Sequence, residues 1–194
     1  MAGLAAGVVV VGGLAGCTGG PDEPSWTPTV WTPEETVEPS PTPTPTPDDP
    51  AAIPPERPAA MDTGDTAGAE AFATYFIELF PYVFATGDVD AFRAHSHPEC
   101  VFCTDVIATA EAQTGAGGHS EGGLIDIQEV TALEIDPGKW WGGSVEMVQA
   151  AVVDIDRDGN VVTEVAETAY HVDLAIVREN GIWLMREVSH EEKS

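Results

Sequence analysis

Basic side chains are scarce in this sequence of 194 residues, which holds seven Lys and Arg against 33 Asp and Glu. The net charge of −26 opposes nucleic-acid binding, because proteins bind phosphate backbones by neutralising them with Lys and Arg. It opposes adsorption to an anionic membrane surface for the same reason. We therefore predict no nucleic-acid partner. At 43% hydrophobic, the chain is nevertheless too apolar to be disordered throughout.

The amino terminus lacks an apolar run long enough to cross a membrane. Residues 3–16 are uncharged and apolar or small, whereas a bilayer requires roughly 20 apolar residues. Their length and composition are typical of a signal-peptide core. A buried core helix is the alternative, which the five glycines of the run disfavour by roughly 1 kcal/mol each relative to Ala. Signal peptides usually begin with a basic residue, and none precedes this run, so we expect the natural start upstream.

Cysteine is also scarce, with three in the chain, and the first follows this run directly. Leu14, Ala15, Gly16 and Cys17 resemble the lipobox of bacterial lipoproteins. The resemblance implies cleavage between Gly16 and Cys17 and acylation of the Cys17 thiol, with palmitate as an expected acyl chain. Two acyl chains anchor a protein stably without spanning the bilayer. We therefore predict a lipid-anchored protein on the extracytoplasmic face of the cell membrane, with the lipid bilayer as a partner through Cys17.

Proline is abundant in one segment and rare elsewhere. Thirteen of the 16 prolines lie between Pro21 and Pro58. Proline removes backbone donors and fixes φ, so neither helix nor sheet is expected there. We predict a signal peptide over 1–16, a disordered, acidic Pro/Thr-rich stalk over 17–58, and an α+β domain over 59–194. A proline motif that binds a partner is the alternative for the stalk, but the segment lacks a basic anchor.

Helical periodicity comes first in the domain and strand periodicity follows. Apolar spacing predicts a helix over 68–86, kinked at Pro81, a short helix over 89–95 that Asp88 caps, and a third helix after Cys103. Alternation predicts the strands 124–135, 145–155, 161–177 and 182–188. This order favours an α+β fold in which N-terminal helices pack on a curved antiparallel sheet of about four strands.

Three segments of the domain resemble a known family: 75–78, 82–88 and 97–103. They are similar to an uncharacterised family of actinobacterial lipoproteins, known only as a domain of unknown function. The helical opening and strand-rich end also resemble the cone of nuclear transport factor 2, a curved sheet wrapped over helices. The resemblance implies this fold and a possible homodimer through the sheet. It implies no activity, because the cone serves enzymes and binding modules alike.

Cys100 and Cys103 are the remaining thiols of a chain predicted to be exported. The oxidising exterior favours a short disulfide between them. A redox-active pair at a helix amino terminus is one alternative. A zinc site that adds His95 and His97 is another, although four ligands within nine residues are hard to close into a tetrahedron.

An aspartate-rich segment carries the other weak metal candidates. Asp154, Asp156 and Asp158 match the opening positions of a calcium loop, but Val165 stands where the bidentate Glu is expected. Alternating residues on both sides favour a hairpin turn instead. We accordingly predict no metal site and no cofactor.

Aromatic and polar residues could line a small-molecule pocket in such a cone. The candidates are Tyr75, Trp140, Trp141, Tyr170, His171, Asp173 and Trp183, with Asp173 as a possible base. Tyr170 and His171 are neighbours on a strand and so point to opposite faces. We predict a non-catalytic domain that binds an envelope ligand or protein. The alternative is a small enzyme of the ketosteroid isomerase or dehydratase type.

Overall fold

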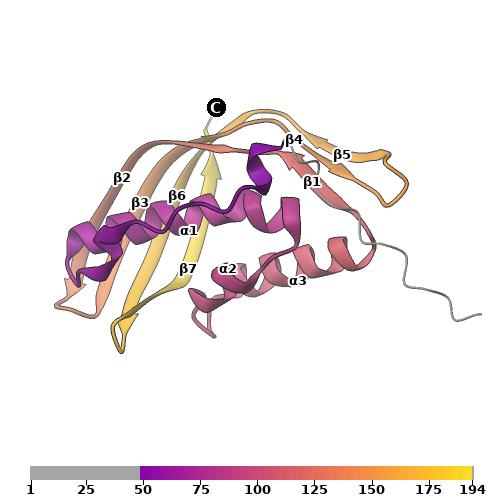
Figure 1. Ribbon diagram of the computed structural model, residues 1–194. Coiled ribbons are helices and arrows are strands. Elements are labelled where there is room, and N and C mark those ends of the chain that lie inside the picture. Colours follow the sequence, from indigo (N-terminus) through magenta and orange to yellow (C-terminus); the bar gives the residue numbers. More distant parts are fainter. Residues whose placement is uncertain (1–48, 194) are drawn as a thin grey trace, which may run out of the picture. The chain divides into compact units, whose positions relative to one another are not determined.

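The computed structural model describes residues 49–193 (Figure 1). The predicted signal peptide, its cleavage site at Gly16 and Cys17, the lipidation site and the stalk up to residue 48 lie outside the described residues. The predicted stalk includes residues 49–58, yet this segment is folded in part. Pro50–Ala52 form the 3-10 helix η1, in which Ala51 is buried, and the Asp49 carboxylate accepts the backbone N–H of Gly122 at 3.1 Å.

The longest helix, α1 (Thr66–Thr86), follows a second 3-10 helix, η2 (Ala59–Asp62). The side chain of Asp65 caps its amino terminus, and Gly87 ends it at a φ of 72°, a conformation that glycine adopts without strain. The helix confirms the prediction over 68–86. It continues through Pro81, where we expected a kink.

Two shorter helices follow, α2 (Asp90–Ala94) and α3 (Val101–Gly115). The N-cap residue of α2 is Val89, so the prediction that Asp88 caps this helix is wrong by one position; the Asp88 carboxylate accepts the N–H of Asp90 at 3.1 Å. The prediction that α3 starts after Cys103 is wrong, because the sulfur of Cys100 already accepts the N–H of Cys103 and caps the helix three residues earlier. A cysteine is not among the usual capping residues, so no local pattern indicates this start.

Within residues 49–193, seven strands form two antiparallel sheets. They are β1 (His119–Gly122), β2 (Ile125–Asp136), β3 (Trp140–Gln149), β4 (Val152–Ile155), β5 (Val161–Val165), β6 (Thr168–Glu179) and β7 (Ile182–Glu192). The main sheet has the order β2-β3-β6-β7, and the small sheet has the order β1-β4-β5. The α+β class and the four-stranded sheet agree with the prediction.

The small sheet was not predicted, and two strand predictions were too long. The strand expected over 145–155 is β3 followed by β4, and the strand expected over 161–177 is β5 followed by β6. In both cases the chain passes between the main sheet and the small one. The first strand of the small sheet, β1, lies within a glycine-rich segment, 115–123, that none of the strand predictions covers.

The core lies between α1 and one face of the main sheet, which arches over that helix (Figure 1). Four apolar side chains of α1, those of Phe72, Phe76, Leu79 and Val83, share one face of the helix and are almost fully buried. At the amino-terminal half of α1, Phe72 stacks on Trp183 with ring centroids 6.2 Å apart. Trp141 packs edge-on against Trp183 at 4.6 Å, and the Trp183 indole N–H donates to the carbonyl of Met61 at 2.9 Å. This half of the interface is closed.

Candidate functional site

An apolar cavity of about 150 Å³ opens at the other half of the interface. Its floor is the inner face of β2, β3, β6 and β7, and helices α1, α2 and α3 provide its walls. The lining residues are Phe76, Ile77, Phe80, Phe92, Phe102, Ile125, Met147, Gln149, Tyr170, Val172, Val188 and His190. Small-molecule sites are typically apolar cavities with a few polar groups, and this cavity fits that description.

The polar groups of this cavity are the side chains of Gln149, Tyr170 and His190. Tyr170 is half-buried, and its ring meets the exposed imidazole of His190 edge-on at 5.7 Å between centroids. The strand register explains this arrangement: Met147 lies opposite Tyr170, and Val172 lies opposite His190, so alternate residues face the cavity. The cavity thus combines an apolar wall with a few hydrogen-bonding groups.

A second cavity, of about 240 Å³, lies between α1 and the small sheet. Phe80, Gln149 and Tyr170 line both cavities, so the two are adjacent. The other lining residues are Pro81, Phe84, Ser120, Gly122, Gly123, Val152, Asp154 and Val165.

The polar wall of the second cavity is held by hydrogen bonds between β1 and β4, where Ser120 lies opposite Asp154. The buried Ser120 hydroxyl donates to Oδ1 of Asp154 at 2.6 Å. The Gln113 amide, from α3, reaches both the Ser120 hydroxyl at 3.1 Å and the same carboxylate oxygen at 3.4 Å. These contacts fix a carboxylate at the edge of an otherwise largely apolar space.

The structure places one of the seven predicted pocket residues, Tyr170, at the cavities. Three of the others, Tyr75, Trp141 and Trp183, are at most 7% exposed and belong to the core. Trp140 is 40% exposed, and the guanidinium carbon of Arg186 lies over its ring, 5.9 Å from the ring centroid. None of these four residues lines either cavity. The three buried ones fill the core with their large rings instead of bordering a cavity.

The last two, His171 and Asp173, face away from the cavities on the outer side of β6. His171 contacts the carboxylate of Glu146 through Nδ1 at 2.8 Å and that of Asp173 through Nε2 at 3.4 Å. The hydrogen bond to Glu146 raises the pKa of His171 above its ordinary value. The pKa of Glu146 is lowered chiefly by the hydrogen bond that Lys193 donates to it, and next by its hydrogen bond with His171. Asp173 therefore is not placed to act as a base in either cavity.

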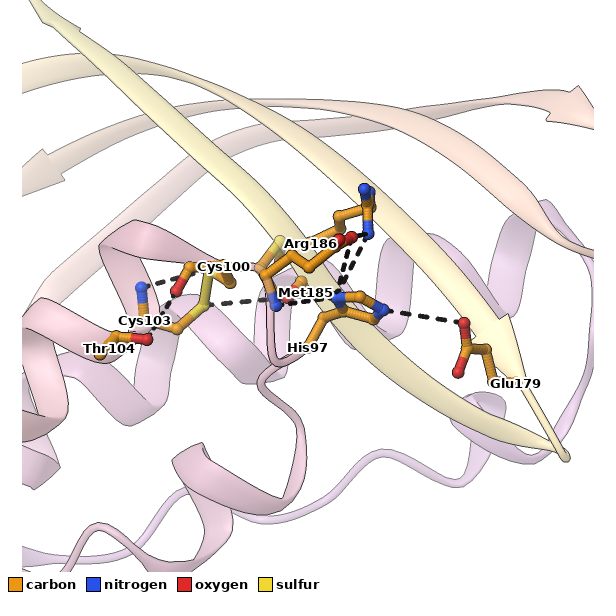
Figure 2. Close-up of polar contacts among 8 residues, drawn as sticks. His97, Cys100, Cys103, Thr104, Glu179, Met185 and Arg186 are labelled. Atoms are coloured by element: carbon orange, nitrogen blue, oxygen red, sulfur yellow. Dashed lines mark hydrogen bonds and ion pairs between the residues drawn. A yellow bond between two sulfur atoms is a disulfide. The ribbon is translucent and has the colours of Figure 1, made fainter.

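Cys100 and Cys103 form the predicted disulfide at the start of α3 (Figure 2). Both cysteines are fully buried, and the Cys103 sulfur lies 3.8 Å from the carbonyl of Met185 on β7. Between them, Phe102 points to the first cavity and stacks on Phe80 at 6.2 Å. The disulfide therefore helps to position one wall of that cavity.

The two histidines of the zinc alternative have separate partners. His95 contacts the carbonyl of Trp183 through Nδ1 at 2.9 Å and packs edge-on against the ring of Tyr75. His97 lies between Arg186, at 3.3 Å, and the carboxylate of Glu179, at 3.8 Å (Figure 2). With both cysteines in the disulfide, the four residues do not form a ligand set.

The aspartates of the calcium alternative are also engaged in other contacts. Asp156 accepts the backbone N–H groups of Asp158 and Asn160, each at 2.9 Å, as expected of a hairpin turn. These hydrogen bonds lower the pKa of Asp156, and the bond from the Asn160 backbone N–H has the largest effect. Asp154 points instead toward Ser120. Over residues 49–193, no group of three or more His, Cys, Asp or Glu side chains is arranged to hold a metal ion.

Sequence reasoning missed most of the residues that form the cavities. Val188 and His190 face inward only because a bulge at Arg186 shifts the register of β7 after the buried residues Trp183 and Met185. A strict period of two would have assigned them to the outer face. Ser120 carried no local signal either, because its role depends on pairing with Asp154, 34 positions away.

The fold and cavities define a class of protein: an α+β domain whose helices cover one face of a curved antiparallel sheet beside apolar cavities. The chain belongs to the family of unknown function DUF6318, whose model matches residues 45–189. No curated protein matches the chain significantly.

Solved structures of similar fold share little sequence with the chain. The crystal structure of the intermembrane space region of the chloroplast protein ARC6 has a TM-score of 0.52 and 10% identity, covering 66% of this chain and 98% of that one. An uncharacterised protein with a cystatin-like fold from Caulobacter vibrioides has a TM-score of 0.43 and 13% identity, covering 63% and 87%. Aln2 from a Streptomyces species has a TM-score of 0.41 and 18% identity, covering 64% and 89%. The likeness to the ARC6 region concerns the fold alone.

None of the helices within residues 49–193 has both the length and the apolar character needed to cross a bilayer. The longest, α1, uses its apolar side chains in the core.

Proposed function

We propose that this protein is a lipid-anchored, extracytoplasmic binding protein whose cone-like domain holds a small apolar ligand between α1 and the main sheet. The observation that carries the binding function is the first cavity, which is lined by nine apolar side chains and by Gln149, Tyr170 and His190. Such a lining favours binding through apolar burial, with the polar groups fixing the orientation of the ligand.

The proposal favours binding over catalysis because of the placement of the charged groups. An isomerase or dehydratase reaction needs a positioned acid or base next to the substrate. The predicted base, Asp173, lies on the outer face of β6, and its contact is with His171. Among the residues that line the two cavities, Asp154 alone has a carboxylate, and it accepts hydrogen bonds from Ser120 and Gln113.

Binding can be tested with N-phenyl-1-naphthylamine, a neutral apolar dye whose fluorescence rises in apolar surroundings. The full chain should bind the dye, and Val188→Trp should weaken binding at least about tenfold, because the indole would fill the first cavity. The matched control is Val162→Trp on β5, where the side chain is 62% exposed and lines neither cavity.

Equal dye affinities for the two variants, or no binding by the native chain, would overturn the proposed ligand site. Ile125→Trp provides a second filling variant from another strand, so a folding defect in one variant does not decide the result.

The anchoring part of the proposal is supported by the apolar run over 3–16 and the following Cys17. Cys17→Ser should move the protein from the membrane fraction to the soluble fraction, and mass spectrometry of the native protein should show acyl chains on the amino-terminal cysteine. Retention of the variant on membranes would contradict lipid anchoring through Cys17.

A further inference from the structure

We infer that the two cavities together form one amphipathic site, which selects a ligand with an apolar body and a primary ammonium head. This inference rests on the proposed function, because it names the class of ligand that the first cavity would take. The apolar body would occupy the first cavity, and the ammonium group would lie in the second, next to Asp154.

The cavities are adjacent and differ in polarity. Phe80, Gln149 and Tyr170 form the boundary between them, since these three side chains line both. A molecule longer than the first cavity would therefore pass the boundary and meet the wall formed by β1 and β4. The described lining of the first cavity has no carboxylate, whereas that of the second has one, from Asp154.

Hydrogen bonds hold the carboxylate of Asp154 in place through only one of its two oxygen atoms. Its Oδ1 atom accepts from the Ser120 hydroxyl and the Gln113 amide. Within residues 49–193, its Oδ2 atom receives no hydrogen bond. A ligand head with several N–H groups can donate to this free Oδ2 atom, which favours an ammonium group in the second cavity.

The charges of the cavity lining and of the whole chain also favour a cationic ligand head. The lining of the two cavities has no Lys or Arg among the described residues, so neither of these side chains competes for Asp154 or attracts an anionic head. Phe80, Phe84 and Tyr170 add aromatic rings, which attract cations. The chain as a whole, at −26, also favours the approach of a cation over that of an anion.

Three probes with the same eight-carbon chain test the inference: octylammonium, octanol and octanoate. Each is titrated against the full chain carrying N-phenyl-1-naphthylamine, and the concentration that displaces half of the dye is compared. Octylammonium should displace the dye at a concentration at least about tenfold lower than octanol, and octanoate should be the weakest.

Asp154→Asn should abolish the preference for octylammonium over octanol while leaving displacement by octanol unchanged. Asp173→Asn is the matched control, because it removes a carboxylate from the outer face of β6 and should leave the preference intact. Equal displacement by octanoate and octylammonium in the native chain would overturn the inference without any variant. Equal effects of the two Asp→Asn changes would overturn it as well.

The outcomes separate this inference from the proposed function. If the native chain binds no dye, the proposed function fails. If dye and octanol bind but the ammonium head brings no advantage, the first cavity is still a ligand site, and only the amphipathic site is wrong.

Discussion

The two halves of the interface between α1 and the main sheet use aromatic residues in opposite ways. In the first half of the helix, Phe72 packs against Trp183, which in turn packs against Trp141, and all three side chains are at most 2% exposed. In the second half, Phe80 lines both cavities and Phe84 lines the second one. The closed half stabilises the fold, and this allows the open half to keep empty space that a ligand can fill.

Truncation in the closed half should have the largest effect on stability. Trp183→Ala removes a fully buried indole and its hydrogen bond to Met61, and we expect it to lower the free energy of unfolding by about 3–5 kcal/mol. Phe80→Ala, in the open half, should cost only about 1–2 kcal/mol, since the ring is half-buried and already borders both cavities. Urea denaturation measures both. Equal losses would break the comparison between the two halves.

Loss of the disulfide should have an intermediate effect, because Cys100 and Cys103 link the closed half to the wall of the first cavity. Replacing both with Ala should lower the free energy of unfolding by about 2 kcal/mol, as the closed loop is short. Dithiothreitol should destabilise the native chain by a similar amount and leave the double variant unaffected. A native chain that is insensitive to the reductant would contradict a stabilising role for this bond.

Substitution of His171, on the outer face of β6, should change how the free energy of unfolding depends on pH without changing dye binding in the first cavity. The Glu146 contact raises the pKa of His171 in the folded state, so the stabilisation is present below the ordinary histidine pKa and is lost as pH rises through the folded pKa. Unfolding measured between about pH 6 and 8 should therefore show a decline in stability that is smaller in His171→Gln. Dye binding should be the same in both proteins, and a weaker affinity in the variant would connect the two faces of the sheet.

The sequence predicted the presence of helices and strands better than the points at which one strand ends and the next begins. The apolar stripe on α1 and the alternation in β2, β6 and β7 are local patterns, and they correctly identified the core helix and most of the main sheet. The small sheet was missed because β1 lies in a glycine-rich segment, and its pairing with β4 joins distant residues. Where β3 is followed by β4 and β5 by β6, the alternation of apolar and polar residues gives no clear sign that the chain passes from one sheet to the other.

The candidate site was predicted less well, for a physical reason. We expected the tryptophans to line a pocket, but the indoles of Trp141 and Trp183 are large enough to fill the interface completely. The cavity residues are instead ordinary apolar side chains such as Met147 and Val188. Empty space depends on how side chains from separate elements fit together, and no local pattern in the sequence records it.

The methionine methyl groups offer the most direct test of the ligand cavity, because they report on both halves of the interface. Met147 lines the first cavity, whereas Met61 and Met185 are fully buried in the closed half. In an NMR titration of methyl-labelled protein with N-phenyl-1-naphthylamine, the Met147 signal should shift, while those of Met61 and Met185 should stay in place. Shifts at Met185 without a shift at Met147, or no shifts at all, would contradict a ligand site in the open half.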